Sequence, residues 1–299
     1  MRVLHFSDIH VSTSLSGVPI REFVGKRIIG LGNLTVRRGK KFEQAAHKVR
    51  MLADFMHQVR ADVALCTGDY TALGTEPELE NARRVIEPFL AAPSGFVTVP
   101  GNHDLYLPDA LADGRFERHF GDLLVSDLPE YRRDGQWPTV RLIGEGLAVV
   151  CVNSARPNPQ PWLSSGFVPE AQLQGLSDIV EDPRVSGRFV IVATHYAPRL
   201  ANGQPDHARH GLDNANDFLA ACSGIQRGLV AHGHVHRCYE VRVPEVQIPL
   251  FGAGSATHQG HEGIWVYDIA EGEATAVPGS WTGESYALLE SERRAIFTD

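Results

Sequence analysis

Short apolar runs with the length and composition of buried β-strands recur along the first 231 residues. They occupy residues 3–6, 63–66, 96–99, 189–192 and 229–231. Between the first two runs, apolar residues from Phe42 to Val59 recur at steps of three and four, which predicts an amphipathic helix over about residues 42–60. Further helices are predicted over about 77–91, where Pro77 suits a first turn, and over about 169–179 and 214–222.

The pattern changes after residue 236. Strand-like runs at 239–243, 248–252, 264–269 and 274–277 are separated by Pro, Gly and acidic turns. An α/β first part followed by several β segments predicts two sheets packed face to face, with helices covering the outside. No linker divides the chain, so residues 1–299 are predicted to form a single domain. Residues 12–41, 105–138 and 154–187 have the composition of insertions between core elements.

Metal-ligand residue types follow each of the buried runs. The residues are Asp8 and His10, Asp69, Asn102 with His103 and Asp104, His195, and His234 with His236. Strand ends of an α/β sheet gather at one rim, so these side chains can meet in one site. A set of imidazole, carboxylate and amide ligands without a thiolate is more typical of a site for divalent metals such as Mn, Fe and Zn than of a structural zinc site.

Spacing within these groups points to a two-metal site. Asp69 is the candidate bridging carboxylate, because Gly68 allows a tight turn off the strand. Asp8 and His10 are two residues apart on an extended chain, so both side chains can face one metal. The pair His234 and His236 has the same spacing and could share one metal or divide between two.

The Gly-Asn-His-Asp group contains different chemical functions side by side. Asn102 offers a neutral oxygen ligand, which leaves the neighbouring His103 free for acid–base work. Asp104 is expected to orient His103 through a hydrogen bond. The other histidines, including His210 and His258, do not share this support, and other roles are favoured for them.

The five groups, in order, resemble the calcineurin-like metallophosphoesterase family and its bacterial phosphodiesterase branch. The family signature D-x-H, G-D, G-N-H-[DE], H and G-H-x-H is matched across residues 8–236. The resemblance implies a four-layer α-β-β-α sandwich of two mixed sheets and a centre of two divalent metal ions. One metal would take Asp8, His10, Asp69 and His236, and the other Asp69, Asn102, His195 and His234, with a hydroxide between them. His103 would contact the substrate phosphoryl group.

The activity implied by this resemblance is hydrolysis of phosphate esters, with a phosphodiester or nucleotide-type small molecule as the favoured substrate. A pyrophosphatase acting on a lipid-linked nucleotide such as UDP-diacylglucosamine is the alternative. A hypothesis from another class is a non-catalytic metal-binding interaction scaffold. The complete ligand set, together with His103, favours an enzyme over the scaffold.

Residues 21–42 combine basic and apolar side chains within the 12–41 insertion and its C-terminal flank. The basic residues are Arg21, Lys26, Arg27, Arg37, Arg38, Lys40 and Lys41, against Glu22 alone. One interpretation is a cap packed on the body with its basic side chains in solvent. The other is an amphipathic cap that meets an anionic lipid-like substrate or a membrane surface.

Composition is that of an ordinary globular protein. The chain of 299 residues is 43% hydrophobic and 21% charged, and its formal net charge of −8 disfavours general nucleic-acid binding. The four cysteines have no paired spacing, which favours free thiols. The absence of a secretory signal pattern and of a long apolar run predicts a cytoplasmic protein, peripheral to a membrane if residues 21–42 bind lipid.

Overall fold

The computed structural model describes the chain except for residues 12, 14–25, 34–41, 43, 161 and 299. Within the described residues, seven strands form the first sheet: β1 (Arg2–Phe6), β2 (Val63–Cys66), β3 (Phe96–Thr98), β10 (Ile264–Ala270), β11 (Glu273–Trp281), β12 (Tyr286–Leu288) and β13 (Arg294–Thr298). The order is β12-β11-β10-β1-β2-β3, with β13 also paired to β11. Strands β1, β2 and β3 are parallel, and β10 runs antiparallel to β1.

A second mixed sheet of six strands faces the first. Its strands are β4 (Thr139–Ile143), β5 (Leu147–Cys151), β6 (Phe189–Ala193), β7 (Gly228–His232), β8 (Tyr239–Val241) and β9 (Leu250–Gly252). The order is β4-β5-β6-β7-β9-β8. The four central strands are parallel, and the edge strands β4 and β8 are antiparallel to their neighbours. The central strands are fully buried, as their continuous apolar sequences require.

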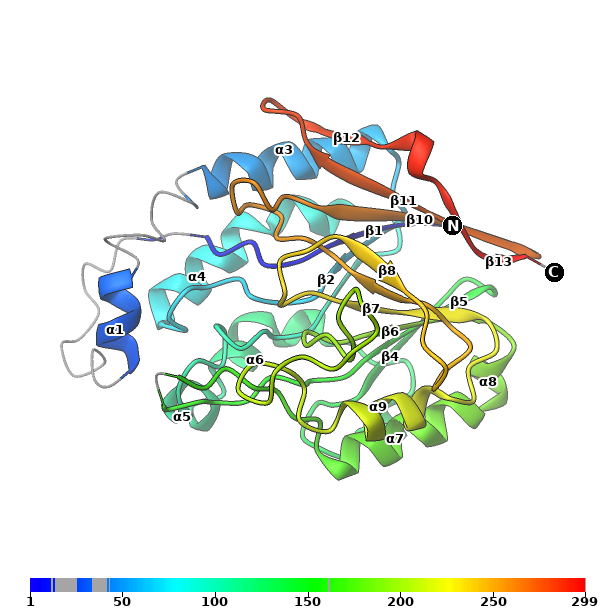
Figure 1. Cartoon of the computed structure of the whole chain (residues 1–299), viewed down its shortest axis with the longest axis horizontal. Helices are drawn as coiled ribbons and strands as arrows, with labels where there is room; N and C mark the ends of the chain where they lie inside the picture. Colours follow the sequence, from blue (N-terminus) through cyan, green and yellow to red (C-terminus); the bar gives the residue numbers. More distant parts are fainter. Residues whose placement is uncertain (12, 14–25, 34–41, 43, 161, 299) are drawn as a thin grey trace.

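Helices cover the outer faces of both sheets, which confirms the four-layer α-β-β-α sandwich (Figure 1). One outer layer contains α3 (Ala45–Gln58), α4 (Glu76–Val85) and the 3-10 helix η3 (Glu87–Ala91), and the other contains α7 (Glu170–Glu181), α8 (Pro183–Ser186) and α9 (Ala215–Cys222). Shorter elements are α5 (Pro108–Ala112), α6 (Arg115–Phe120), η4 (Gly121–Leu123), η5 (Pro129–Tyr131) and η6 (Glu290–Glu292). Helix α1 (Lys26–Asn33) lies at one end of the molecule.

The helices agree with the periodicity of the sequence. Helix α3 buries Val49, Leu52, Phe55 and Met56 on one face, as its three- and four-residue spacing predicts. Helix α4 begins at a capping box in which Thr75 and Glu78 satisfy each other's backbone N–H groups. The segment predicted as one helix over 77–91 is divided into α4 and η3.

The three predicted insertions differ in structure. Residues 105–138 contain only short helices beside the sheets. The prediction that residues 154–187 form a single insertion is wrong, because their second half forms α7, a helix of the outer layer. Of residues 12–41, only residue 13 and helix α1 are described, so the predicted cap lies mainly outside the described residues.

All four cysteines are free, and Cys66, Cys151 and Cys222 are buried, in agreement with the expected thiols. Every helix in the described part of the chain is too short or too polar to cross a bilayer.

Candidate metal centre

The candidate ligands lie in tight turns that follow the parallel strands β1, β2 and β7. Apart from Arg60, the described non-glycine residues with positive φ are Asp8 (55°), His10 (38°), Asp69 (60°), His234 (69°) and His236 (51°). A left-handed backbone is costly for such residues and persists only where the surroundings enforce it. Here the first turn is held by N–H groups of Asp8 and His10, which donate to the carbonyl oxygens of Gly68 and Asp69 at 2.9 and 3.0 Å. The backbone strain is therefore concentrated at residues whose side chains meet in the site.

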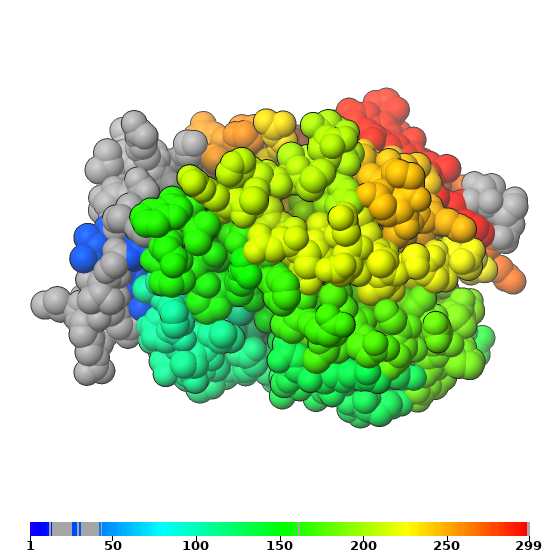
Figure 2. All heavy atoms as spheres, turned by 60° about the horizontal axis from the view of Figure 1, so that its bottom comes forward, coloured from blue at the N-terminus to red at the C-terminus, as the bar shows by residue number. Residues whose placement is uncertain are grey.

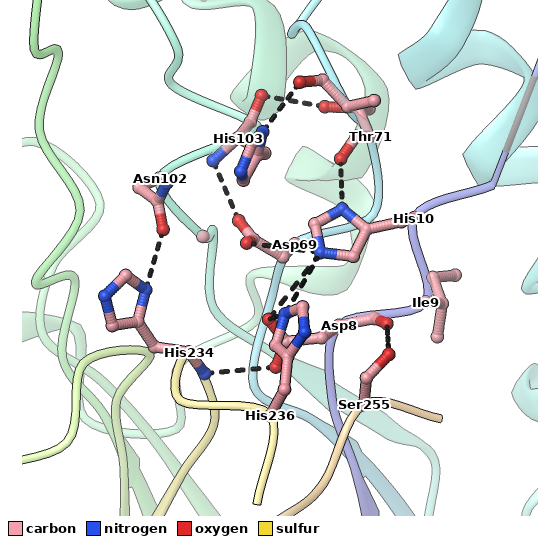
Figure 3. Close-up of polar contacts among 12 residues, drawn as sticks. Asp8, Ile9, His10, Asp69, Thr71, Asn102, His103, His234, His236 and Ser255 are labelled. Carbon is pink, nitrogen blue, oxygen red and sulfur yellow. Dashed lines mark hydrogen bonds and ion pairs between the residues drawn. The ribbon is translucent and has the colours of Figure 1, made fainter. Parts of the chain in front are cut away.

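Four of these side chains converge on one position (Figure 3). Nε2 of His236 lies 3.0 Å from Oδ1 of Asp8 and 3.4 Å from Nε2 of His10. Nε2 of His10 lies 3.6 Å from Oδ2 of Asp69. Asp8, His10 and His236 thus form a cluster close enough to hold one metal ion.

The ring of His10 presents a lone pair to this cluster. Its Nδ1 lies 2.8 Å from the carbonyl oxygen of Thr71, which can only accept a hydrogen bond. A neutral His10 therefore carries its proton on Nδ1 and turns an unprotonated Nε2 toward the carboxylates of Asp8 and Asp69. A cation placed between these facing lone pairs would be coordinated by all of them, so the donor set fits a divalent metal.

A second position lies on the other side of Asp69. Oδ2 of Asp69 is 3.5 Å from Nε2 of His195, and this nitrogen is 3.1 Å from Oδ1 of Asn102. His234 approaches the same Asn102 oxygen with Nδ1 at 2.9 Å, while its Nε2 faces the carbonyl oxygen of His210 at 2.9 Å. Burial lowers the pKa of His234, so its ring is neutral and has one proton for two acceptors. A cation between His234 and Asn102 would resolve this conflict.

Two glycines allow the loops that carry Asp69 and Asn102 to touch backbone to backbone. Gly68 adopts φ +97°, and a Cβ there would lie 2.5 Å from the Gly101 nitrogen. A Cβ on Gly101 would lie 2.1 Å from Oδ1 of Asp69. The close approach lets the His103 N–H donate to that same Oδ1 at 2.8 Å, which leaves Oδ2 to face the two metal positions.

Asp104 corrects one prediction. Its carboxylate accepts backbone N–H bonds from Gly101, Asp69, Tyr70 and Thr71 at 2.8–3.0 Å. The ring of His103 instead has Nδ1 2.6 Å from the carbonyl oxygen of Ala72. The prediction that Asp104 hydrogen-bonds to the His103 ring is therefore wrong, and Asp104 instead is a clamp for the two loops that carry the ligands. Burial and the neighbouring Asp69 raise the pKa of Asp104 to about 7, against the effect of its N–H donors.

The electrostatics of the centre favour cations. Burial would raise the pKa of Asp8, but the charge and hydrogen bond of His236 bring it below its usual range. Asp69 behaves in the same way, with His195 as the main opposing group. Burial lowers the pKa of His195, yet Asp69 outweighs this effect and raises the pKa to about 9. In the metal-free protein a proton on His195 therefore balances the carboxylates.

Three further residues touch the candidate ligands: the sequence favoured other roles for His210 and His258, and it gave no signal for Ser164. Nδ1 of His258 lies 3.1 Å from Nδ1 of His236. The ring of His210 packs against that of His234, with centroids 4.2 Å apart and planes inclined by 32°, and Asp206 hydrogen-bonds to His210. Ser164 accepts a hydrogen bond from Nδ2 of Asn102 at 3.3 Å. No motif marks these residues, because each reaches the site from a separate loop.

A cleft of about 570 Å³ opens onto the centre. Its floor is formed by the candidate site residues Asp69, Asn102, His103, His234 and His236. Its walls include Ser164, Leu200, Asn202, Asp206, His210 and Arg237. The seven predicted ligands and His103 are therefore gathered at one rim, whereas Asp104 is buried behind the floor.

A model of the calcineurin-like phosphoesterase family matches residues 1–238. The chain belongs to the calcineurin-like phosphoesterase family. This membership makes the protein a metal-dependent phosphoester hydrolase, and the clusters around Asp8 and Asp69 are its candidate metal-binding groups. The comparison with curated proteins gives no match.

Solved structures agree with the fold of this calcineurin-like phosphoesterase. A dimetal phosphatase from Danio rerio is 13% identical with a TM-score of 0.65, and the match covers 100% of this chain and 99% of that one. A purple acid phosphatase from seeds of yellow lupin (Lupinus luteus) is 10% identical with a TM-score of 0.61, covering 100% of this chain and 54% of that one. At these identities the similarity concerns the fold alone.

Proposed function

We propose that the protein hydrolyses phosphodiesters at a centre of two divalent metal ions. The single observation that carries the proposal is the position of one carboxylate oxygen. Oδ2 of Asp69 lies between Nε2 of His10 at 3.6 Å and Nε2 of His195 at 3.5 Å. An oxygen shared by two separate imidazole groups suits a carboxylate that bridges two metals.

The remaining donors divide between the two sides of Asp69. Asp8, His10 and His236 would complete one metal site with Asp69, and Asn102, His195 and His234 would complete the other. Mn, Fe and Zn accept such mixtures of imidazole, carboxylate and amide ligands. When bound, the two ions would bring the pKa of a water near neutrality and polarise the phosphoryl oxygens.

His103 would act on the substrate itself. The carbonyl oxygen of Ala72 holds its Nδ1 and leaves Nε2 as the nitrogen that can meet a phosphoryl or leaving-group oxygen. With the ring protonated on both nitrogens, Nε2–H would donate a hydrogen bond to the phosphoryl group and then pass its proton to the departing oxygen, which would leave a neutral ring with its remaining proton on Nδ1. Asp104 would support this step indirectly, by fixing the backbone on both sides of the cleft floor.

The charge of the cleft favours a diester over a monoester. Among the described residues that line it, Arg237 is the only lysine or arginine. A diester carries one negative charge at neutral pH and a monoester nearly two, so a cleft with one such cation suits the diester better. The walls beyond the metal positions also leave room for a second organic group on phosphorus.

The test is hydrolysis by protein reconstituted with Mn, using bis-p-nitrophenyl phosphate, p-nitrophenyl phosphate and cyclic AMP. We expect turnover of the diester to exceed that of the monoester and to vanish in Asp69→Ala. An exposed carboxylate variant, Asp122→Asn, serves as the matched control and should keep its activity. A faster monoester reaction would overturn the diester proposal, and diester turnover by Asp69→Ala would overturn the bridging role.

A lipid-linked nucleotide such as UDP-diacylglucosamine is the second candidate substrate. Two large apolar side chains support it: Ile28 of α1 is 56% exposed, and Trp162 is 65% exposed. Lys26 of the same helix bonds to Leu163, so these apolar groups belong to neighbouring segments. A lipid or membrane contact would also depend on basic residues that lie outside the described part of the chain. These are Arg21, Arg37, Arg38, Lys40 and Lys41. Turnover of UDP-diacylglucosamine above that of the soluble diesters would favour this candidate.

A further inference from the structure

Helix α1 packs on a small apolar cluster beside the metal centre. This cluster consists of Ala72, Leu73, Tyr106 and Leu107 and is separate from the main core. A Cβ added to Gly30 would lie 2.6 Å from a Leu73 methyl group and 2.9 Å from the Tyr106 hydroxyl, so the helix approaches closely. In Figure 2 the blue surface of α1 lies against teal and green surface from the middle of the chain.

The two basic residues of α1 are buried, contrary to the expectation that the cap's basic side chains lie in solvent. Lys26 is 8% exposed and Arg27 is 1% exposed. Arg27 donates to Asp109 at 2.7 Å and to the carbonyl oxygen of Leu73 at 3.0 Å, which fastens the helix to the loops under it. A buried cation is tolerated only with partners of this kind.

Lys26 joins two loops that the helix spans. Its Nζ donates to the carbonyl oxygen of Leu163 at 2.7 Å. The same ammonium lies 4.9 Å from the centroid of the Tyr106 ring, within the range of a cation–π interaction.

Each of these two partners leads to a residue of the metal centre. Tyr106 stacks on the ring of His103, with centroids 5.3 Å apart and planes inclined by 18°. Leu163 precedes Ser164, whose hydroxyl accepts the hydrogen bond from Nδ2 of Asn102 and so turns Oδ1 toward the metal position. The Lys26 ammonium group thus reaches His103 through one residue, Tyr106. It also contacts Leu163, the neighbour of the Ser164 that supports Asn102.

We propose that Lys26 is a positioning residue that holds His103 and Asn102 in their working orientations through Tyr106 and the 163–164 backbone. The inference rests on the proposed function, which assigns the roles of His103 and Asn102. Small displacements of such groups are costly, since a misplacement of about 1 Å can reduce a rate ~10²-fold. Lys26 touches neither substrate nor metal in this role.

The test compares Lys26→Met, which removes the charge and the donor, with Lys26→Arg, which keeps both. At saturating Mn we expect Lys26→Met to lower kcat for bis-p-nitrophenyl phosphate about tenfold, with little change in KM. Lys26→Arg should recover most of the loss. Arg50→Met, which removes an exposed cation from helix α3, is the matched control and should retain the wild-type kcat.

A second pair of variants tests the path through the ring. Tyr106→Phe keeps the aromatic face and should remain near wild type, whereas Tyr106→Leu should resemble Lys26→Met. The double variant Lys26→Met/Tyr106→Leu should lose little more than either single variant, because both remove the same support. Additive losses would show that the two residues act separately and would overturn the proposal. If Lys26→Met does not fold, the Tyr106 variants still test the path through the ring: a wild-type kcat in Tyr106→Leu would overturn it.

A readout independent of activity separates this inference from the proposed function. In ¹³C-histidine relaxation measurements on folded, metal-loaded protein, the His103 ring should become more mobile in Lys26→Met and return to wild-type behaviour in Lys26→Arg. A His103 ring equally ordered in all three proteins would overturn the positioning role, even in an active enzyme. An ordered wild-type centre without phosphoesterase activity would instead contradict the proposed function, while the mobility comparison would still decide the role of Lys26.

Discussion

Replacing Asp104 by asparagine should strongly destabilise the protein without changing the size of the side chain. Oδ2 accepts N–H bonds from Asp69 at 2.9 Å and Gly101 at 2.8 Å, and Oδ1 accepts them from Tyr70 at 2.9 Å and Thr71 at 3.0 Å. The asparagine NH₂ group must occupy one of these two positions. In either orientation, two buried backbone N–H groups then face another donor.

The magnitude follows from the number of hydrogen bonds lost. Each buried donor without an acceptor costs about 1–3 kcal/mol, so two such groups should lower the free energy of unfolding by about 2–6 kcal/mol. The comparison is made at pH 8, above the pKa of about 7 of Asp104, where the wild-type side chain is ionised. Because the same bonds hold the backbone of Asp69, the variant should also bind Mn more weakly.

Urea denaturation of the metal-free protein measures the loss in free energy of unfolding, and metal content after dialysis against limiting Mn measures the weaker metal binding. Asp122→Asn is the control: Asp122 is 61% exposed and pairs with Arg83 at 2.9 Å, so its loss should cost no more than the ~1 kcal/mol of a surface ion pair. If Asp104→Asn unfolds at the same urea concentration as the control, the clamp role of Asp104 is refuted.

Three other predictions concern the same centre. Gly101→Ala should lower the free energy of unfolding by about 1–3 kcal/mol and reduce Mn content, because its Cβ would lie 2.1 Å from Oδ1 of Asp69. Gly146→Ala, where a Cβ has open space, is its control, and equal stability of the two variants in urea would contradict the prediction. Mn binding at pH 7.5 should release protons, because the pKa of about 9 keeps His195 protonated in the metal-free protein. Calorimetry in two buffers of different ionisation enthalpy detects the release, and identical heats would rule it out. Adding Mn at 100 times its Kd should raise the free energy of unfolding by about 2.7 kcal/mol, and a chelator should reverse this. A thermal midpoint indifferent to both would show that no metal couples to folding.

Most of the fold could be predicted from local patterns. The helix that became α3 was visible in the spacing of Val49, Leu52 and Met56, and the strands in continuous apolar runs. These signals survive because burial of an apolar face depends on the period of the element itself. The helix that became α7 was predicted over about residues 169–179, but residues 154–187 were still misjudged as a single insertion, because the polar stretch before that helix has the composition of a loop.

The candidate site could be predicted only as a set of residue types. Asp8, Asp69 and His195 stand at strand ends, and parallel strands bring such ends to one rim. The partner of Asp104 could not be predicted in the same way, since its hydrogen bonds depend on how the loops after β2 and β3 close on each other. The burial of Lys26 likewise depends on where α1 meets Tyr106 and Leu163.

The sequence by itself determined which chemical groups are available and the order in which the strands present them. Only the tertiary structure decided how each group faces the others. His10 and His234 illustrate the difference, because the first turns Nε2 inward and the second turns Nδ1 inward. The choice is made by the carbonyl oxygens of Thr71 and His210, each more than 20 residues away in the chain. A hydrogen bond to one ring nitrogen determines which lone pair is left for a metal, and that partner is brought near only when the chain folds.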